Sequence, residues 1–287
     1  MTKAWQNALL LAVCAALASC SATRIAYDNA DTALRFMASS YLDLDGPQAD
    51  DLRQRIVRFH QWHRASELPV YAALLRSASA RAARGITAED VAWGLASVRT
   101  RYRRLAAKAA EDAAPVLATL ASAQVAALER RFAENNEKYA RKFLAADDAK
   151  RGGAQTKRML DHFRDFAGQL TPEQEGRIER FALAHERHVF LRFEDRRRWQ
   201  HEAVAALAQK HGAQELGRDL ARTFEKPELR RSEEFIREDK RWDEDLGRLI
   251  VDLDRSLSAE QRARVVQRLS GYAEDFSALA GEKKEAV

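Results

Sequence analysis

Four histidines are the residues of this sequence whose type and spacing best suit chemistry. His60 and His63 are three positions apart, and His185 and His188 repeat that spacing. Side chains at i and i+3 share one face of a helix, so each pair can offer two imidazoles to one metal ion if another helix adds ligands. The alternative is that both pairs end the apolar stripes of their helices as ordinary core or half-exposed histidines. The spacing leaves both interpretations open.

Other catalytic patterns are sparse. The string HERH at 185–188 brings its second histidine one residue too early for the HExxH zinc-protease motif. The sequence contains no glycine-rich phosphate loop and no nucleophile elbow, and its acidic residues mostly alternate with Arg and Lys at helical spacing, as on an exposed helix face. We therefore expect a protein without catalytic residues or cofactors. The alternative is a metal-dependent enzyme, or a metal-binding protein, that uses the two HxxH pairs.

A basic segment stands out between residues 98 and 108. No acidic residue occurs between Asp90 and Glu111. Such a segment can bind an anionic surface such as a lipid headgroup layer, at about 1 kcal/mol per charge. A solvated helix face is the other interpretation. The candidate anion-binding residues are Arg99, Arg101, Arg103, Arg104 and Lys108.

The amino terminus predicts export. Lys3 is the only charged side chain among the first nineteen residues, and an apolar run follows at 8–18, as in a secretory signal. The string LASC at 17–20 resembles the lipobox of bacterial lipoproteins, which implies that the Cys20 sulfur receives diacylglycerol and that residues 1–19 are removed. An ordinary signal cleaved near Ser19, or a buried helix with an incidental cysteine, is the alternative. Cys14 would leave with the signal, so a lipidated mature chain would have no thiol for a disulfide or for catalysis.

Location and partners follow from this resemblance. Several acyl chains attach a protein stably to a bilayer, whereas one chain binds only marginally. Ser21 occupies the position where the inner-membrane retention signal would carry Asp, which indicates the outer membrane, facing the periplasm. The formal net charge is +5; export nevertheless argues against a nucleic-acid partner. We expect a membrane contact through the lipid, and an envelope protein or unfolded client as partner.

Composition predicts an all-α protein. The 287 residues include only 5 Pro and 12 Gly, and Ala, Leu, Arg and Glu dominate. We expect an elongated bundle of about nine or ten helices. The longest should run from Pro172 to about Lys210, because its interior has no proline and only one early glycine.

Four similar strings divide the chain. Each begins with Leu, has Gln at its fifth position and predicts a helix start. In the last two, Thr171 or Ser258 can cap the helix and Gln174 or Gln261 completes a capping box. They are LDGPQ (44–48), LASAQ (120–124), LTPEQ (170–174) and LSAEQ (257–261). Their spacing suggests two similar halves, each opening and closing with one string. We expect a signal at 1–19, a lipidated tether at 20–28, and helical halves at 29–150 and 151–287.

Two family resemblances are present. LTPEQ and LSAEQ look like the LTxxQ motif of Spy-like periplasmic chaperones, with Leu170, Thr171, Gln174, Leu257 and Gln261 at the matching positions. More widely, the lipobox with RIAYDNAD (24–31), DLDGPQ (43–48), WHRASELPVYAALL (62–75) and NNEKYARKFL (135–144) resembles a family of uncharacterised bacterial lipoproteins, a domain of unknown function. The wider resemblance implies the location and the α-helical fold class but no activity. We expect an envelope lipoprotein that binds or scaffolds, with a chaperone-like protein as a variant.

Overall fold

The computed structural model describes residues 23–144, 148–209 and 211–281. Within them every regular element is helical, which confirms the predicted all-α class. Eleven α-helices and one 3-10 helix lie wholly within these ranges, slightly more than the nine or ten expected, and residues 23–28 are helical as well. The elements are α2 (Ala30–Tyr41), α3 (Gly46–Ser66), α4 (Leu68–Arg84), α5 (Ala88–Leu117), α6 (Ser122–Phe143), α7 (Asp148–Ala167), α8 (Pro172–Ala184), α9 (Glu186–Ala208), α10 (Ala213–Glu225), η1 (Pro227–Leu229), α11 (Glu233–Ser256) and α12 (Ala259–Gly281).

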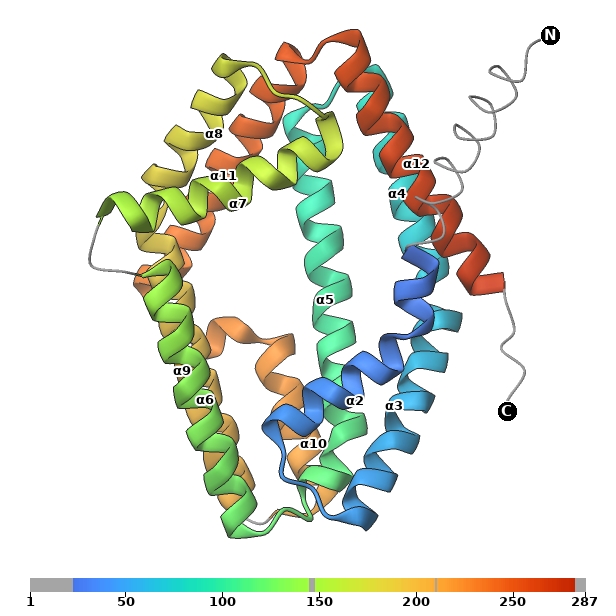
Figure 1. Cartoon of the computed structure of the whole chain (residues 1–287), viewed down its shortest axis with the longest axis vertical. Coiled ribbons are helices and arrows are strands. Elements are labelled where there is room, and N and C mark those ends of the chain that lie inside the picture. Colours follow the sequence, from blue (N-terminus) through green and yellow to red (C-terminus); the bar gives the residue numbers. More distant parts are fainter. Residues whose placement is uncertain (1–22, 145–147, 210, 282–287) are drawn as a thin grey trace, which may run out of the picture.

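The helices form an elongated frame rather than a single parallel bundle (Figure 1). Helices α3, α4 and α12 follow one long side, α6 and α9 follow the other, and α5 runs between them. Helices α7, α8 and α11 gather at one end of the long axis. None of the described helices has a stretch of apolar residues long enough to cross a bilayer.

All four Leu–Gln strings begin helices, as their sequence predicts. At the start of α8, the Thr171 hydroxyl accepts from the Gln174 backbone N–H at 3.3 Å, and the Gln174 side chain accepts from the Thr171 N–H at 3.0 Å. Ser258 and Gln261 repeat this capping box before α12, and Asp45 and Gln48 do so before α3. At the start of α6, Ala121 has no side-chain acceptor, so only the glutamine arm remains.

The strings also meet in pairs. The Gln124 amide nitrogen donates to Gln48 Oε1 at 2.7 Å, and Gln174 and Gln261 donate to each other at 3.1 and 3.0 Å. In both pairs each amide also donates to the backbone carbonyl five residues before its partner glutamine. The first string is therefore hydrogen-bonded to the second, and the third to the fourth, through the same set of donors and acceptors.

The leucines that open the strings lie at the two hydrophobic cores. Leu120 is buried in a core among α5, α6, α9 and α10, and Leu44 packs at its edge. Leu170 is buried in a second core among α7, α8 and α11, where Leu257 packs at the edge. Complete burial of one such leucine contributes about 1.5–3 kcal/mol.

The two stretches predicted as halves are interlocked in space. Helix α4, before residue 150, packs along α12, which comes after it. In the corresponding way α9 packs along α6, so the last helix of each stretch lies against the other stretch. The contact of α5 with α10 and α11 adds a third connection across the boundary. The core among α5, α6, α9 and α10 combines residues of both stretches, whereas the core among α7, α8 and α11 lies within residues 151–287.

The prediction of one long helix from Pro172 to about Lys210 is wrong. The helix ends at Ala184, and a new one begins at Glu186. His185 sits between them with φ −116° and ψ 21°, outside helical geometry. A buried contact of His185 with α11, described below, accompanies this break. The longest described helix is instead α5, which has 30 residues and accommodates Pro115 near its end.

Candidate functional site

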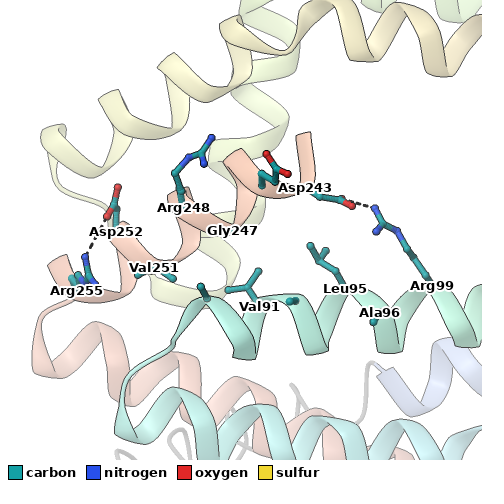
Figure 2. Close-up of a pocket in the computed structure, with 13 residues that line it drawn as sticks. Val91, Leu95, Ala96, Arg99, Asp243, Gly247, Arg248, Val251, Asp252 and Arg255 are labelled. Atoms are coloured by element: carbon teal, nitrogen blue, oxygen red, sulfur yellow. Dashed lines mark hydrogen bonds and ion pairs between the residues drawn. The ribbon is translucent and has the colours of Figure 1, made fainter. Parts of the chain in front are cut away.

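A groove between α5 and α11 is the candidate site, with a cavity volume of about 590 Å³. Figure 2 shows α5 along one side and α11 along the other, with their side chains facing the gap. The lining residues are Ala88, Val91, Ala92, Leu95, Ala96 and Arg99 of α5, and Asp243, Glu244, Gly247, Arg248, Val251, Asp252 and Arg255 of α11.

The floor of the groove is apolar because α5 places small and aliphatic side chains on the face that lines it. Its alanines at 88, 92 and 96 follow an i, i+4 spacing and lie on one stripe, next to the stripe of Val91 and Leu95. From the other side α11 contributes Val251 and Gly247. Small side chains on two facing helices leave room that larger ones would fill. The groove can therefore accept apolar groups from another molecule.

The rim of the groove carries ion pairs. Arg99 of α5 bonds to Asp243 of α11 and so ties the two helices together. This hydrogen bond raises the pKa of Arg99 above its ordinary value. Farther along, Arg255 lies 3.9 Å from Asp252. Since positive and negative groups already neutralise each other, the rim has no strong preference for one sign of charge.

His60 and His63 belong to an aromatic cluster near the start of the described chain. The Tyr27 hydroxyl lies 2.8 Å from His63 Nδ1, and the Tyr27 ring centroid is 4.6 Å from that of His60. Burial, with a smaller contribution from His60, lowers the pKa of His63 to about 4. Burial also raises the pKa of Tyr27 to about 12. The phenol therefore donates to a neutral imidazole around pH 7.

His185 and His188 lie at the α8–α9 break and face α11. His185 Nε2 is 3.0 Å from Asp245 Oδ2, and His188 Nε2 is 2.9 Å from Asp239 Oδ1. The His188 ring stacks on Trp242 with centroids 5.3 Å apart. Burial lowers the pKa of His185, because this effect outweighs the opposing attraction of Asp245. Each imidazole here is paired with a carboxylate of one neighbouring helix.

The two histidine pairs do not form a common centre. The first pair contacts Tyr27, and the second contacts carboxylates of α11. Among the described residues, the group whose ligand atoms all lie within 4.8 Å of one another is a different one: His211, Glu215 and Asp219. It is largely exposed and lies at the start of α10. The described geometry therefore gives no support to a metal site shared by the four predicted histidines.

The basic segment is largely neutralised within the protein. Arg99 pairs with Asp243, and Lys108 pairs with Asp112 one turn away. At the α3–α4 junction, Glu67 lies 3.6 Å from Arg101 and 2.8 Å from Arg104. Only Arg103 is exposed and, within the described residues, without an ion pair. Four of the five cations predicted to bind an anionic surface thus have a carboxylate partner within the protein.

Cys20, the predicted lipidation site, lies outside the described residues. The groove itself was not foreseen. The i, i+4 alanines before Arg99 are a sequence signal of close helix approach, but nothing local indicates that α11 is the partner.

Comparison with family models decides the relationship of the chain to other proteins. Residues 40–237 match the model of a family of unknown function (DUF6279). The chain belongs to this family. The DUF6279 match spans both histidine pairs and the α5 side of the groove, whereas the α11 side, from Asp243 onward, follows the matched region. No match was found among curated proteins or among solved structures.

Proposed function

We propose that this DUF6279 protein is a lipid-anchored bacterial envelope protein that binds, without catalysis, apolar segments of a non-native protein. The observation that carries the proposal is the α5–α11 groove, with an apolar floor and a rim of mutually neutralised charges. A floor of Ala, Val and Leu side chains binds apolar surfaces of many shapes, because the hydrophobic effect is non-directional. A rim that carries both signs of charge tolerates client segments of either sign.

The anchor is supported by the amino-terminal sequence. Lys3, the apolar run at 8–18 and LASC at 17–20 have the order and spacing of a lipoprotein signal. Ser21 after the cysteine favours the outer membrane, facing the periplasm. A holding protein fixed there would meet exported chains before they fold.

The anchor is tested on the protein from membranes. Mass spectrometry of the wild type should find an acylated amino-terminal Cys20. The Cys20→Ala variant should remain unprocessed or leave the membrane fraction. An unmodified amino terminus at Ser21 or later would refute the anchor and leave the binding proposal to be judged separately.

The groove is tested by suppression of aggregation. Reduced, unfolded lysozyme diluted into buffer should aggregate several-fold more slowly with the wild type present. Leu95→Asp places a charge on the groove floor and should remove most of this protection. Leu183→Asp is the matched control, since Leu183 on α8 is 49% exposed and does not line the groove. Equal protection by both variants would contradict the proposal.

A further inference from the structure

The first described segment, residues 23–41, is held firmly against the body of the protein. Arg24 Nε lies 3.0 Å from Asp275 Oδ1 on α12, and Asp28 pairs with Arg64 on α3. Tyr27 adds the contact with His63 described above. The pinned part therefore begins only four residues after Cys20, a distance of at most about 14 Å even for a fully extended chain.

The same segment has an outward face without charge. Its charged side chains, Arg24, Asp28, Asp31 and Arg35, are only half exposed, and each has a carboxylate or guanidinium partner. By contrast, all exposed residues of the segment are uncharged, in a chain of which 32% is charged. They are Ile25, Ala26, Asn29, Thr32, Ala33, Phe36, Met37, Ser39 and Ser40.

Three large apolar side chains dominate this face. Phe36 is 76% exposed, Ile25 is 60% exposed and Met37 is 52% exposed. Ile25 precedes the turn at Asn29, whereas Phe36 and Met37 are neighbours on α2. Helix α2 buries no residue, and Figure 1 shows it crossing the outside of the frame from α3 toward α6.

Three polar side chains on this face donate hydrogen bonds within the segment. The hydroxyls of Ser39 and Ser40 donate to the carbonyls of Phe36 and Met37, at 2.9 and 2.7 Å. In the same way Asn29 donates to the Ile25 carbonyl at 2.8 Å. Polar side chains that are bonded internally lose little when water is withdrawn.

Helix α7 provides a comparison within the same chain. It precedes the third Leu–Gln string directly, as α2 precedes the first. Its exposed side chains are nevertheless largely charged or polar, and include Lys157, Arg158, Asp161, His162, Arg164 and Asp165. The uncharged face is thus a property of the helix near Cys20 and not of this position in the fold.

We propose that the outward face of residues 25–40 lies in the interfacial layer of the membrane to which Cys20 is anchored. The inference rests on the proposed lipidation. With so short a connection, the pinned segment cannot move far from the bilayer, so its apolar face lies against lipid as an interfacial helix does. The body then has a fixed orientation on the membrane.

The test uses the full-length lipidated protein in vesicles of phosphatidylethanolamine and phosphatidylglycerol that contain a doxyl-labelled lipid. Once Cys20 is acylated and Cys14 is removed, a cysteine introduced by Phe36→Cys is the only thiol, and it is labelled with the fluorophore NBD. Leu183→Cys on α8 is the control, because that side chain is similarly apolar and exposed. Circular dichroism establishes that both variants keep the helical fold.

NBD at position 36 should emit at shorter wavelength and be quenched by the doxyl lipid several-fold more strongly than NBD at position 183. Equal quenching in vesicles that carry the protein would overturn the inference while leaving the anchor intact. A blue shift without doxyl quenching would also overturn it and would indicate a protein contact on this face. Failure of the wild type to float with vesicles would overturn the anchor, and this inference with it.

Discussion

The side-chain amides of Gln174 and Gln261 bond to each other in both directions, with N–O distances of 3.1 and 3.0 Å. Each oxygen also accepts from the backbone N–H of its own helix N-cap residue. Each nitrogen also donates to the backbone carbonyl of the residue directly before the other string, Ser256 for Gln174 and Gln169 for Gln261. Both donors of each amide, and two acceptor positions on each oxygen, are thus used. Two helix starts 87 residues apart are joined by groups buried from water.

Removal of one of these amides should therefore lower the free energy of unfolding much more than a surface substitution does. Gln174→Ala should lower the free energy of unfolding by about 3 kcal/mol, since it leaves buried partners unsatisfied. Denaturant unfolding measures this. In the double variant with Gln261→Ala the loss should be smaller than the sum by about 1–2 kcal/mol. Gln169→Ala is the control, because that side chain is exposed and only its backbone carbonyl takes part; an equal loss there would contradict the explanation.

The pair formed by Gln48 and Gln124 should matter less. Its geometry is the same, but one of the reciprocal distances is 3.4 Å, and neither glutamine is buried. Water can replace the lost partner, so Gln124→Ala should lower the free energy of unfolding by only about 1 kcal/mol. Denaturant unfolding beside Gln174→Ala gives the ranking. A loss as large as that of Gln174→Ala would show that burial does not control the difference.

The fold class and the helix starts were predictable because they depend on composition and on residues close together in the sequence. Thr171 and Gln174, or Ser258 and Gln261, are three residues apart, and a capping box needs nothing else. The pairing of the helix starts depends on contacts between glutamines that are 76 and 87 residues apart. A single sequence does not reveal such contacts. The break at His185 escaped prediction for the same reason, since its partner Asp245 lies on a distant helix.

The candidate site was less predictable than the fold. The histidines predicted as metal ligands contact other groups: His60 packs against the Tyr27 ring, and His188 pairs with Asp239. The arginines were expected on the surface, but their carboxylate partners lie elsewhere in the chain, as for Arg99 and Asp243. The groove lies between α5 and α11, whose residues Arg99 and Asp243 are 144 positions apart in the sequence. Neither helix sequence by itself indicates a groove.

Protonation of His63 should destabilise the protein in mild acid. Its pKa is about 4 in the folded state, mainly through burial, against an ordinary value of 6.5. Between these values the unfolded chain binds more protons, so stability is full above about pH 6.5 and falls as pH is lowered toward 4. Protonation also removes the acceptor for the Tyr27 hydroxyl.

Two measurements check this prediction. An NMR titration should show the His63 ring titrating near pH 4 instead of near the ordinary value of 6.5. Denaturant unfolding at pH 7 and pH 5 should show a smaller difference for His63→Gln than for the wild type. His201→Gln is the control, since that side chain is exposed. If His63 titrates near 6.5, burial of the ring does not exclude its charged form.

The last prediction concerns Glu67, which is fully buried at the α3–α4 junction. Arg104 Nε lies 2.8 Å from Glu67 Oε1, and Arg101 lies 3.6 Å from Oε2. Removal of the cations leaves a buried carboxylate without compensation, a change that costs 3–5 kcal/mol for fully enclosed pairs. Arg104 is 52% exposed, so water screens part of the attraction. We therefore expect about 2 kcal/mol of destabilisation for Arg101→Gln with Arg104→Gln.

Two comparisons separate this effect from a general loss of surface charge. Arg103→Gln removes a neighbouring exposed cation that has no ion pair within the described residues, and it should change the free energy of unfolding by less than about 0.5 kcal/mol. Adding Glu67→Gln to the double arginine variant should restore part of the lost stability, because no buried charge then remains. Denaturant unfolding of the four proteins decides the matter. If Glu67→Gln gives no recovery, Arg104 stabilises the junction by packing over Trp62 and not by neutralising the carboxylate.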